Sequence, residues 1–551
     1  MVHFIAPSVP RMTNLISNMR ILSFLRRLWS GETEGVAAAA ALVSVASLFS
    51  RLLGLLRDRL LATHFGAGLE LDAYYAAFRL PDLLYNLLIL GALSAGFIPL
   101  FTELRERQNL KAAMRFTGQA LSLLGFVLVI ACAIGVIATP VIVPFLAHGF
   151  DAPKQALTTM LTRIMFLSPL FLGISAIMGG VLQSTKRFFA FAFAPIFYNL
   201  GIILGIVCFV PWLGLSGLAW GVVVGAFLHG FVQYLAVRPL GSLRLSWPSF
   251  EAEPVRRMVK LMIPRTAGLA VAQINLVIIL FFASSLGEGS VSVFNLAGNL
   301  QSFPLGLIGI SFAIAAFPVL AQAVGAKNDE LFQDTLHQAV RRILYFILPL
   351  CVLFIVLRAQ IVRVVLGDGR FDWNDTRLTL QVFALLTLAL PAQALSQLLT
   401  RAFYALQEAW RPFFIACASE MATVLVAWCT YRSLGVDGLA WAIVAGSVVN
   451  IVLLLVLLRR RVRMRIWSRS AWRFAGGLLL ALVIQAAITH FVKYALGLWL
   501  EPLERAWMVL LQGAFAGILG GVGFLLITTM FRIAESDMVV RLKNKLVSRL
   551  F

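Results

Sequence analysis

Long apolar runs separated by short charged or turn-forming connections recur along this 551-residue chain, from about residue 35 to residue 533. About 20 residues of α-helix cross the hydrocarbon core of a bilayer, and these runs are long enough to do so. A transmembrane β-barrel would show short segments of alternating polarity instead. The pattern therefore predicts an all-α, polytopic membrane protein. We expect 14 transmembrane helices, at residues 35–62, 73–102, 117–147, 156–183, 187–211, 214–237, 257–285, 290–324, 339–366, 377–405, 410–433, 436–458, 472–495 and 506–532.

The composition agrees with this pattern, and the distribution of charged residues predicts which connections are cytoplasmic. Hydrophobic residues make up 60% of the chain, charged residues 13%, and the mean hydropathy is +0.90. The formal charge of +21 comes from short clusters between apolar runs, not from one basic face, so no nucleic-acid partner is expected. Alternate connections carry roughly 23 of the lysines and arginines, and the intervening ones carry about six. The basic side is expected to be cytoplasmic, and an even span number places both termini there.

An internal repeat links the two halves of the chain. Three pairs of short segments match at one common offset: HFGAG (64–68) with SLGEG (285–289), GFD (149–151) with RFD (370–372), and LGLSGLAW (213–220) with LGVDGLAW (434–441). The repeat predicts two six-helix lobes around a central cavity, at residues 35–240 and 256–460. The remaining segments are a C-terminal helix pair at 470–533, a cytoplasmic tail at 534–551, and residues 1–34, expected as a helix on the membrane surface or a frayed tail. Parallel repeats of this kind are typical of transporters in which one lobe rocks against the other.

The first expected helix carries four charges in the stretch SRLLGLLRDRLL: Arg51, Arg57, Asp58 and Arg59. A charge in the bilayer core costs several kcal/mol unless it is paired or faces water. The repeat equivalents of Arg51, Arg57 and Asp58 are Ala272, Ile278 and Ile279, so the second lobe lacks these charges. This contrast favours a functional role for Arg51 and Arg57. For Arg59, near the helix end, extension to the interface is the preferred interpretation.

The second expected helix contributes Asp72 and Arg79, and Pro81 interrupts it. Arginine guanidinium groups match phosphate geometry, so the two helices predict a cavity for an anionic, phosphate-bearing ligand. Arg265 and Glu420 are further candidates in the second lobe, with a local ion pair or an interfacial position preferred for Glu420. The chain has no phosphate-binding loop motif, no HExxH and no metal-ligand spacing, so neither an ATPase nor a metal or cofactor is expected. Transport would then be driven by the membrane potential, an ion gradient or the substrate gradient.

The stretch SRLLGLLRDRLLATHFGAGLELDAYYAAFRLPDLL, followed by GALSAGFIPLF, resembles the N-terminal signature of the MurJ (MviN) lipid II flippases of the multidrug/oligosaccharidyl-lipid/polysaccharide exporter superfamily. The resemblance implies a bacterial inner-membrane transporter, not an enzyme. It would move an undecaprenyl-pyrophosphate-linked peptidoglycan precursor, lipid II, from the inner to the outer leaflet for cell-wall synthesis. It implies that arginines of the first lobe bind the pyrophosphate and that residues 472–532 form a groove for the lipid tail. A monomer is expected, with membrane lipids and cell-wall synthesis enzymes as candidate partners.

Two stretches depart from the family pattern. Where the family has paired arginines after the LPxLL turn and an acid shortly afterwards, this chain has Tyr85, Asn86 and Leu90. Where the family has an Asp-Arg pair before FP, this chain has Gly298 and Asn299. Arg79 and Arg265 are candidate substitutes. Otherwise the substrate is another polyprenyl-linked oligosaccharide, or the chain is a drug or ion antiporter or a scaffold without transport. The candidate substrate-binding residues are thus Arg51, Arg57, Asp58, Asp72, Tyr85, Arg79, Arg265 and Asn299.

Overall fold

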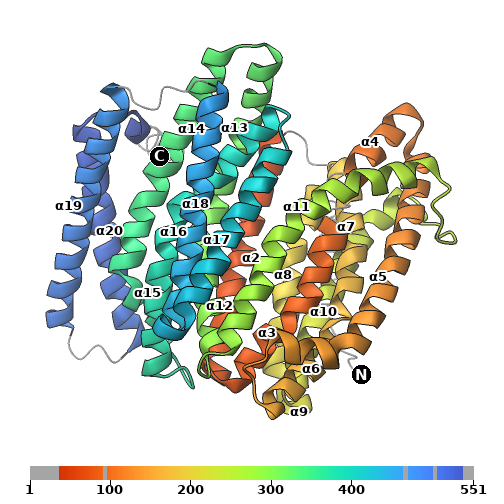
Figure 1. Ribbon diagram of the computed structural model, residues 1–551, viewed down its shortest axis with the longest axis horizontal. Coiled ribbons are helices and arrows are strands. Elements are labelled where there is room, and N and C mark those ends of the chain that lie inside the picture. The colour runs from red at the N-terminus through yellow and green to blue at the C-terminus, as the bar shows by residue number, and fades with distance from the viewer. Residues whose placement is uncertain (1–35, 91–95, 463–468, 501–504, 538–551) are drawn as a thin grey trace, which may run out of the picture. The chain divides into compact units, whose positions relative to one another are not determined.

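The computed structural model describes residues 36–90, 96–462, 469–500 and 505–537, and this part of the chain is helical without a strand. The expected segment at 1–34 and most of the expected tail at 534–551 lie outside it. The helices in the first half of the chain are α2 (Val36–Phe65), α3 (Leu69–Tyr85), α4 (Ile98–Arg107), α5 (Leu110–Leu146), α6 (Ala152–Met165), α7 (Ser168–Ser184), α8 (Phe188–Leu204), α9 (Val210–Leu213) and α10 (Ser216–Val237). Those in the second half are α11 (Glu253–Ser284), α12 (Ser290–Pro304), α13 (Ile310–Gly325), α14 (Asp329–Val356), α15 (Arg358–Val365), α16 (Trp373–Ala405), α17 (Trp410–Leu434), α18 (Val436–Val462), α19 (Arg469–Trp499) and α20 (Ala506–Met530) (Figure 1).

Eleven helical stretches of the described part are long and apolar enough to cross a membrane, and each coincides with an expected span. The polytopic helical class is therefore confirmed. The other three expected spans fall on α2, on α3 with α4, and on α11, which are not among the eleven, so the number fourteen stays a prediction. The helix of the span expected at 339–366 extends further toward the N-terminus. The helix α14 begins at Asp329, where the Asn328 side chain accepts a hydrogen bond from the Leu331 amide and caps the polar first turns.

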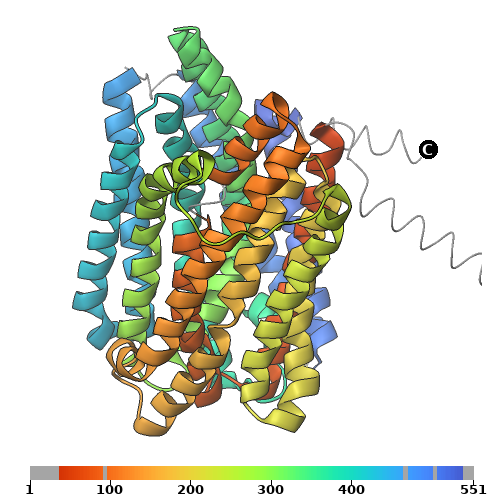
Figure 2. The same ribbon diagram turned by 90° about the vertical axis from the view of Figure 1, so that its right-hand side faces the viewer.

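Two compact units divide the described chain, and each unit combines separate stretches of sequence. The first contains residues up to Gly54, Leu80–Pro140 and Thr159–Ala270. In it, α10 packs against α7 and α8, and Figure 2 shows α8 and α10 running side by side in yellow. A Cβ atom at Gly201 would lie 2.2 Å from the Cα atom of Gly225, so the absence of side chains lets these two helix backbones touch.

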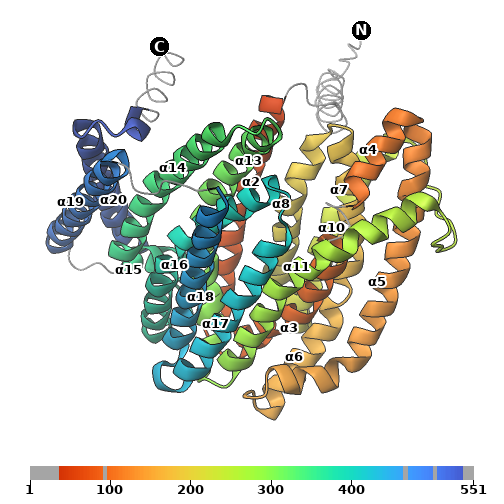
Figure 3. The ribbon, with the colours of Figure 1, turned by 45° about the horizontal axis from the view of Figure 1, so that its top comes forward.

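The second unit contains Leu55–Arg79, Val141–Thr158 and Val271–Phe551. Its core forms where α13, α14, α16 and α18 bury leucines, alanines and phenylalanines against one another. The pair α19 and α20 packs together, and this pair contacts α14 and α15 of the same unit (Figure 3). The expected domain limits at 35–240, 256–460 and 470–533 stay predictions.

Loop contacts inside the second unit follow the internal repeat. A side chain at Gly149 would collide with the backbone of Ser284, and a side chain at Gly66 would collide with the carbonyl of Arg370. The Arg370 amide also donates to the carbonyl of Thr63 at 2.9 Å. Arg370 is the repeat equivalent of Gly149, and Thr63 is that of Ser284. The contact between Gly149 and Ser284 therefore corresponds to the contact between Arg370 and Thr63. Segments matched only by sequence therefore occupy corresponding places.

The repeat extends to helix capping. The Asp151 carboxylate accepts from the Lys154 amide at the start of α6, and the Asp372 carboxylate accepts from the Asp375 amide at the start of α16. Each aspartate is the last residue of its matched segment, GFD or RFD, and so holds the same position in its own repeat. An aspartate before the first helical turn satisfies amides that have no partner within the helix. The GFD and RFD matches thus mark two equivalent helix starts.

Candidate functional site

The charged stretch of α2 meets α12 inside the second unit. The Arg57 guanidinium donates through Nε and Nη2 to Oδ1 of Asp58, at 3.0 and 2.7 Å. The other carboxylate oxygen of Asp58 accepts from Nδ2 of Asn299 at 3.0 Å. Asp58 is only 3% exposed, whereas the Arg57 side chain is 21% exposed. The carboxylate is therefore an internal counter-charge that orients a more accessible guanidinium.

The ion pair joins neighbouring positions of the helix. Adjacent residues of an α-helix point about 100° apart, and the long arginine side chain spans that angle. The sequence presented Asn299 as a missing arginine, and it did not show that Asn299 would be the hydrogen-bond donor to Asp58.

A second arginine joins the same helix pair. Arg79, near the end of the part of α3 that belongs to the second unit, donates through Nη2 to Oδ1 of Asn295 on α12. Asn295 in turn donates to the carbonyl of Val291, one turn earlier, which fixes its amide orientation. Tyr75 is 8% exposed, and it lies close enough to Arg57, Asp58 and Arg79 to interact with them electrostatically. The helices α2, α3 and α12 thus gather a polar cluster, defined as Arg57, Asp58, Tyr75, Arg79, Asn295 and Asn299.

Asp72 lies in a separate buried network at the start of α3. Its carboxylate pairs with Nζ of Lys154 at 2.7 Å, and the two side chains are 1% and 8% exposed. The same carboxylate accepts from the amides of Gly289 and Ser292 and from the Ser292 hydroxyl, at 2.7 to 2.8 Å. A carboxylate at a helix N-terminus satisfies unpaired amides and opposes the helix dipole. Asp72 therefore joins α3, α6 and α12, and its role in substrate binding stays a prediction.

The capping between α3 and α12 is reciprocal. Oε1 of Glu288, just before α12, accepts from the amide of Leu69, the first residue of α3, at 2.7 Å. Gly289 adopts φ +84°, and a Cβ atom there would lie 2.1 Å from the carbonyl oxygen of Ala67. These contacts join HFGAG and SLGEG, the two segments matched by the repeat. Lys154 was absent from the expected site, because no sequence spacing relates it to Asp72.

The remaining expected residues take other positions. Arg51 is half-buried on the part of α2 in the first unit, without a hydrogen-bond partner among the described residues. Tyr85 packs beside Ile89 in a small apolar cluster of the first unit. Arg265 lies in α11, and its side chain is outside the described part of the chain. Arg59 donates to the carbonyl of Val364 and pairs with an exposed Asp368, as a residue near a helix end can.

Glu420 lies in a cavity, and not in the local ion pair or interfacial position that its sequence context favoured. It lines a cavity of about 430 Å³ between helices of the second unit, together with polar side chains of α11, α16, α17 and α18. Glu420 is hydrogen-bonded to Asn275, and it is the one charged residue among the described side chains that line the cavity. Two buried polar atoms of the lining, Asn275 Oδ1 and Ser396 Oγ, have no hydrogen-bond partner in the described part. The second unit thus holds a polar chamber, separate from the polar cluster of α2, α3 and α12.

Comparison with known proteins places this arrangement in a family. The family model described as "Lipid II flippase MurJ" matches residues 61–504. A probable lipid II flippase MurJ from Rhizobium tropici is 32% identical over 87% of this chain and 90% of its own length. A lipid II flippase MurJ from Burkholderia cenocepacia is 30% identical over 88% of this chain and 96% of its own length.

Solved structures agree at the level of the fold. A structure described as "Lipid II flippase MurJ, inward closed conformation" superposes with a TM-score of 0.72 at 23% identity, covering 89% of this chain and 98% of that one. An inward-facing multidrug resistance MATE family transporter of the MOP superfamily gives 0.64 at 17% identity, covering 75% of this chain and 94% of that one. The fold and the relatives together identify a multi-pass bacterial inner-membrane transporter, not an enzyme. The chain belongs to the lipid II flippase MurJ family.

Proposed function

We propose that this protein moves lipid II, an undecaprenyl-pyrophosphate-linked peptidoglycan precursor, from the inner to the outer leaflet by alternating access. The names of its relatives support the substrate. The observation that carries the proposal is the accessible Arg57 guanidinium, held by a buried Asp58. Arg79 adds a second cation on the neighbouring helix, and Arg51 precedes Arg57 on α2.

The pyrophosphate binds the arginines through charge-assisted hydrogen bonds. Such bonds contribute about 1.5–3 kcal/mol each, whereas neutral ones contribute about 0.5–1.5. Asp58 compensates the charge of Arg57 when the substrate is absent, and Asn295 accepts a hydrogen bond from Arg79. The buried network around Asp72 and Lys154 joins α3, α6 and the start of α12. Breaking that network would accompany release to the outer leaflet.

Complementation in cells tests the role of Arg57. The host's own lipid II flippase is depleted, and the wild type, Arg57→Ala or Arg59→Ala is supplied at equal membrane abundance. Arg59 is the matched control, since it lies two residues away on α2 and pairs with an exposed aspartate. Rescue by the wild type and by Arg59→Ala, without rescue by Arg57→Ala, is expected. Rescue by Arg57→Ala would remove the pyrophosphate-binding assignment, and failure of the wild type would reject lipid II as the substrate.

Another polyprenyl-linked oligosaccharide is the second candidate substrate. The observation that favours it is the neutral Asn299 bonded to Asp58, where the family pattern has a charged pair. Reconstitution in proteoliposomes with lipid II, or with an undecaprenyl-pyrophosphate oligosaccharide that lacks the pentapeptide, separates the two. Faster flipping of the second lipid than of lipid II would favour this alternative.

The polar chamber around Glu420 is the proposed position for energy coupling. The described side chains that line the cavity beside Glu420 are neutral, so the interactions of this carboxyl group change strongly when it binds or releases a proton or another cation. The membrane potential or an ion gradient would act on it. We also propose that both termini are cytoplasmic, that the protein works as a monomer, and that cell-wall synthesis enzymes use its product.

A further inference from the structure

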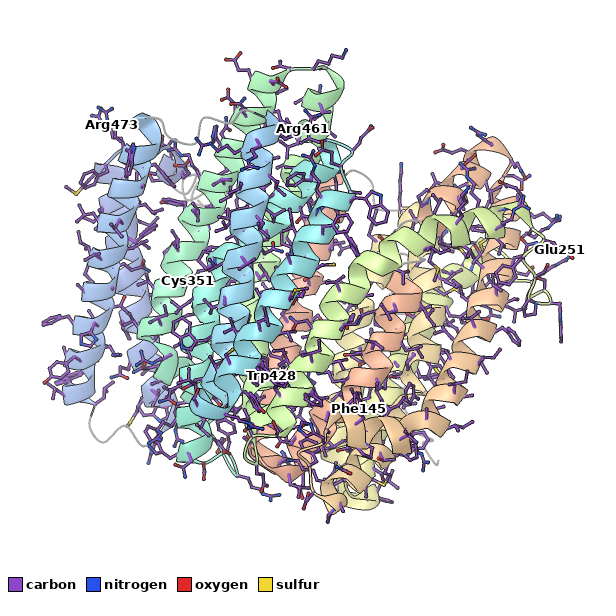
Figure 4. All side chains as sticks on the ribbon, viewed as in Figure 1. Phe145, Glu251, Cys351, Trp428, Arg461 and Arg473 are labelled. Atoms are coloured by element: carbon purple, nitrogen blue, oxygen red, sulfur yellow. The ribbon has the colours of Figure 1, made fainter. Side chains whose placement is uncertain are left out.

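The segment Gly241–Phe250, which joins α10 to α11, is an exposed apolar strip at one end of the first unit. Three of its large apolar side chains, Leu245, Trp247 and Phe250, are 71%, 89% and 58% exposed. Glu251, labelled in Figure 4, marks where the segment ends. An indole ring left in water loses most of the free energy that burial of its large surface provides. The strip therefore needs a partner that covers it.

The position of the segment along the membrane normal follows from two helices. The helix α10 has 22 residues, which is about 33 Å at 1.5 Å per residue and close to the hydrocarbon thickness of about 30 Å. The segment begins shortly after α10 ends at Val237. On α5, exposed large apolar side chains extend from Phe126 to Phe145, about 29 Å along the helix. The C-terminal end of α10 and the start of the exposed apolar surface of α5, at Phe126, therefore both lie near the segment.

A direct contact fixes that level. The Ser246 amide donates to Oγ of Ser122 at 3.1 Å, and Ser122 lies one helical turn before Phe126. A Cβ atom at Gly118, one turn earlier, would lie 2.1 Å from the carbonyl oxygen of Arg244, so the segment rests directly on the α5 backbone. Leu243 packs into the core of the first unit. The segment is thus held beside the end of the exposed apolar surface of α5, with Leu245 and Trp247 exposed.

The charges of the segment match an anionic headgroup. Arg244 in the segment and Arg238, three residues before it, are both exposed. Trp212, at the other end of α10, is also 89% exposed, but residues 188–237 contain no lysine, arginine, aspartate or glutamate. Tryptophan is enriched at both membrane interfaces, whereas arginines beside it add attraction for anionic lipids. The two ends of α10 therefore offer an anionic-lipid site and a neutral control.

We propose that Gly241–Phe250 is a binding site for anionic phospholipid. Leu245, Trp247 and Phe250 enter the boundary between headgroups and acyl chains, and Arg238 and Arg244 bind the phosphate of the same leaflet. The site anchors the connection between α10 and α11 to the membrane. This proposal does not depend on which lipid the protein transports.

Tryptophan fluorescence in nanodiscs tests the site. The emission of Trp247 is obtained as the difference between wild type and Trp247→Phe, and that of Trp212 as the difference between wild type and Trp212→Phe. Nanodiscs contain phosphatidylcholine alone or with phosphatidylglycerol, with and without brominated acyl chains. We expect Trp247 emission to be blue-shifted and quenched by the brominated lipid, and the quenching to increase with phosphatidylglycerol. Trp212 emission should be quenched equally in both compositions.

Two variants separate the two parts of the proposal. Arg244→Gln should abolish the effect of phosphatidylglycerol on Trp247 and leave quenching in phosphatidylcholine unchanged. Gly118→Val should displace the segment and reduce the quenching of Trp247 without changing any side chain that would contact lipid. Quenching of Trp247 emission by aqueous acrylamide and not by brominated lipid would overturn the proposal. The strip would then be in water, where a soluble protein could bind it. Equal quenching in both compositions would overturn the anionic specificity.

Discussion

Replacing Asp72 by Asn removes the negative charge from the network that joins α3, α6 and α12. The side chain of Asn keeps the shape of Asp and one oxygen that accepts hydrogen bonds. Lys154 would then keep its positive charge at 8% exposure, with the Phe150 ring, centred 4.1 Å from Nζ, still beside it. Removing one partner of a buried ion pair costs about 3–5 kcal/mol, because the other charge stays buried without compensation.

The opposite substitution should cost less. Lys154→Met leaves a carboxylate that still accepts three hydrogen bonds from Gly289 and Ser292 at the N-terminus of α12. The loss is then one charge-assisted hydrogen bond, about 1.5–3 kcal/mol. The double variant Asp72→Asn/Lys154→Met leaves no buried charge, so we expect it to be more stable than Asp72→Asn alone.

Hydrogen exchange of the first turn of α12 measures these costs directly, because the amides of Gly289 and Ser292 donate to Asp72. A decrease of about 3–5 kcal/mol in the free energy of local opening makes amide hydrogen exchange roughly 100- to 4,000-fold faster. Asp368→Asn is the control. The Asp368 side chain is 59% exposed, so its ion pair with Arg59 should contribute at most about 1 kcal/mol to stability. Equal effects of Asp72→Asn and Lys154→Met, or effects no larger than that of the control, would refute the reasoning.

Three further predictions follow from single contacts. Gly289→Ala should lower thermal stability by at least about 1–3 kcal/mol, because φ +84° strains an alanine and its Cβ atom would also lie 2.1 Å from the carbonyl oxygen of Ala67. Gly287→Ala, with open space around it, should be neutral in the same thermal melt. Asn299→Leu removes a donor from the buried Asp58 carboxylate and should cost about 1.5–3 kcal/mol in the same melt; an unchanged melting temperature would show that this hydrogen bond adds nothing. Glu420→Gln should preserve membrane abundance but abolish the dependence of flipping on an imposed potential or ion gradient in proteoliposomes, and a retained dependence would exclude Glu420 from coupling.

The polar cluster shows how far local patterns reach. The four charges of Ser50–Leu61 are visible in the chain, and their cost in a bilayer predicts that they are paired or face water. The identity of each partner is not visible. Asn299 is far from Asp58 along the chain, and only the packing of α12 against α2 brings them together. The sequence could rank Arg57 above Arg59 but could not assign Asn299 as a donor.

Glu420 shows where the sequence ranked the alternatives differently from the structure. It is a candidate for a cavity, but the isolated glutamate in an apolar run favoured a local ion pair or an interfacial position. The cavity depends on polar side chains from four helices, including Asn275 and Ser396, that have no common spacing along the chain. A chamber of this kind is a property of packing, because its volume is what the facing helices leave unfilled.

The chain alone determined the features that depend on local composition and on self-comparison. The length of each apolar run fixes a membrane helix, because a bilayer leaves no other partner for backbone amides, and the common offset of the three matched segment pairs identifies equivalent loops. Tertiary structure decided which groups meet. Asp72 with Lys154, and Arg79 with Asn295, come from helices far apart in sequence, and the free energy of such pairs depends on distance and burial, which no local pattern encodes.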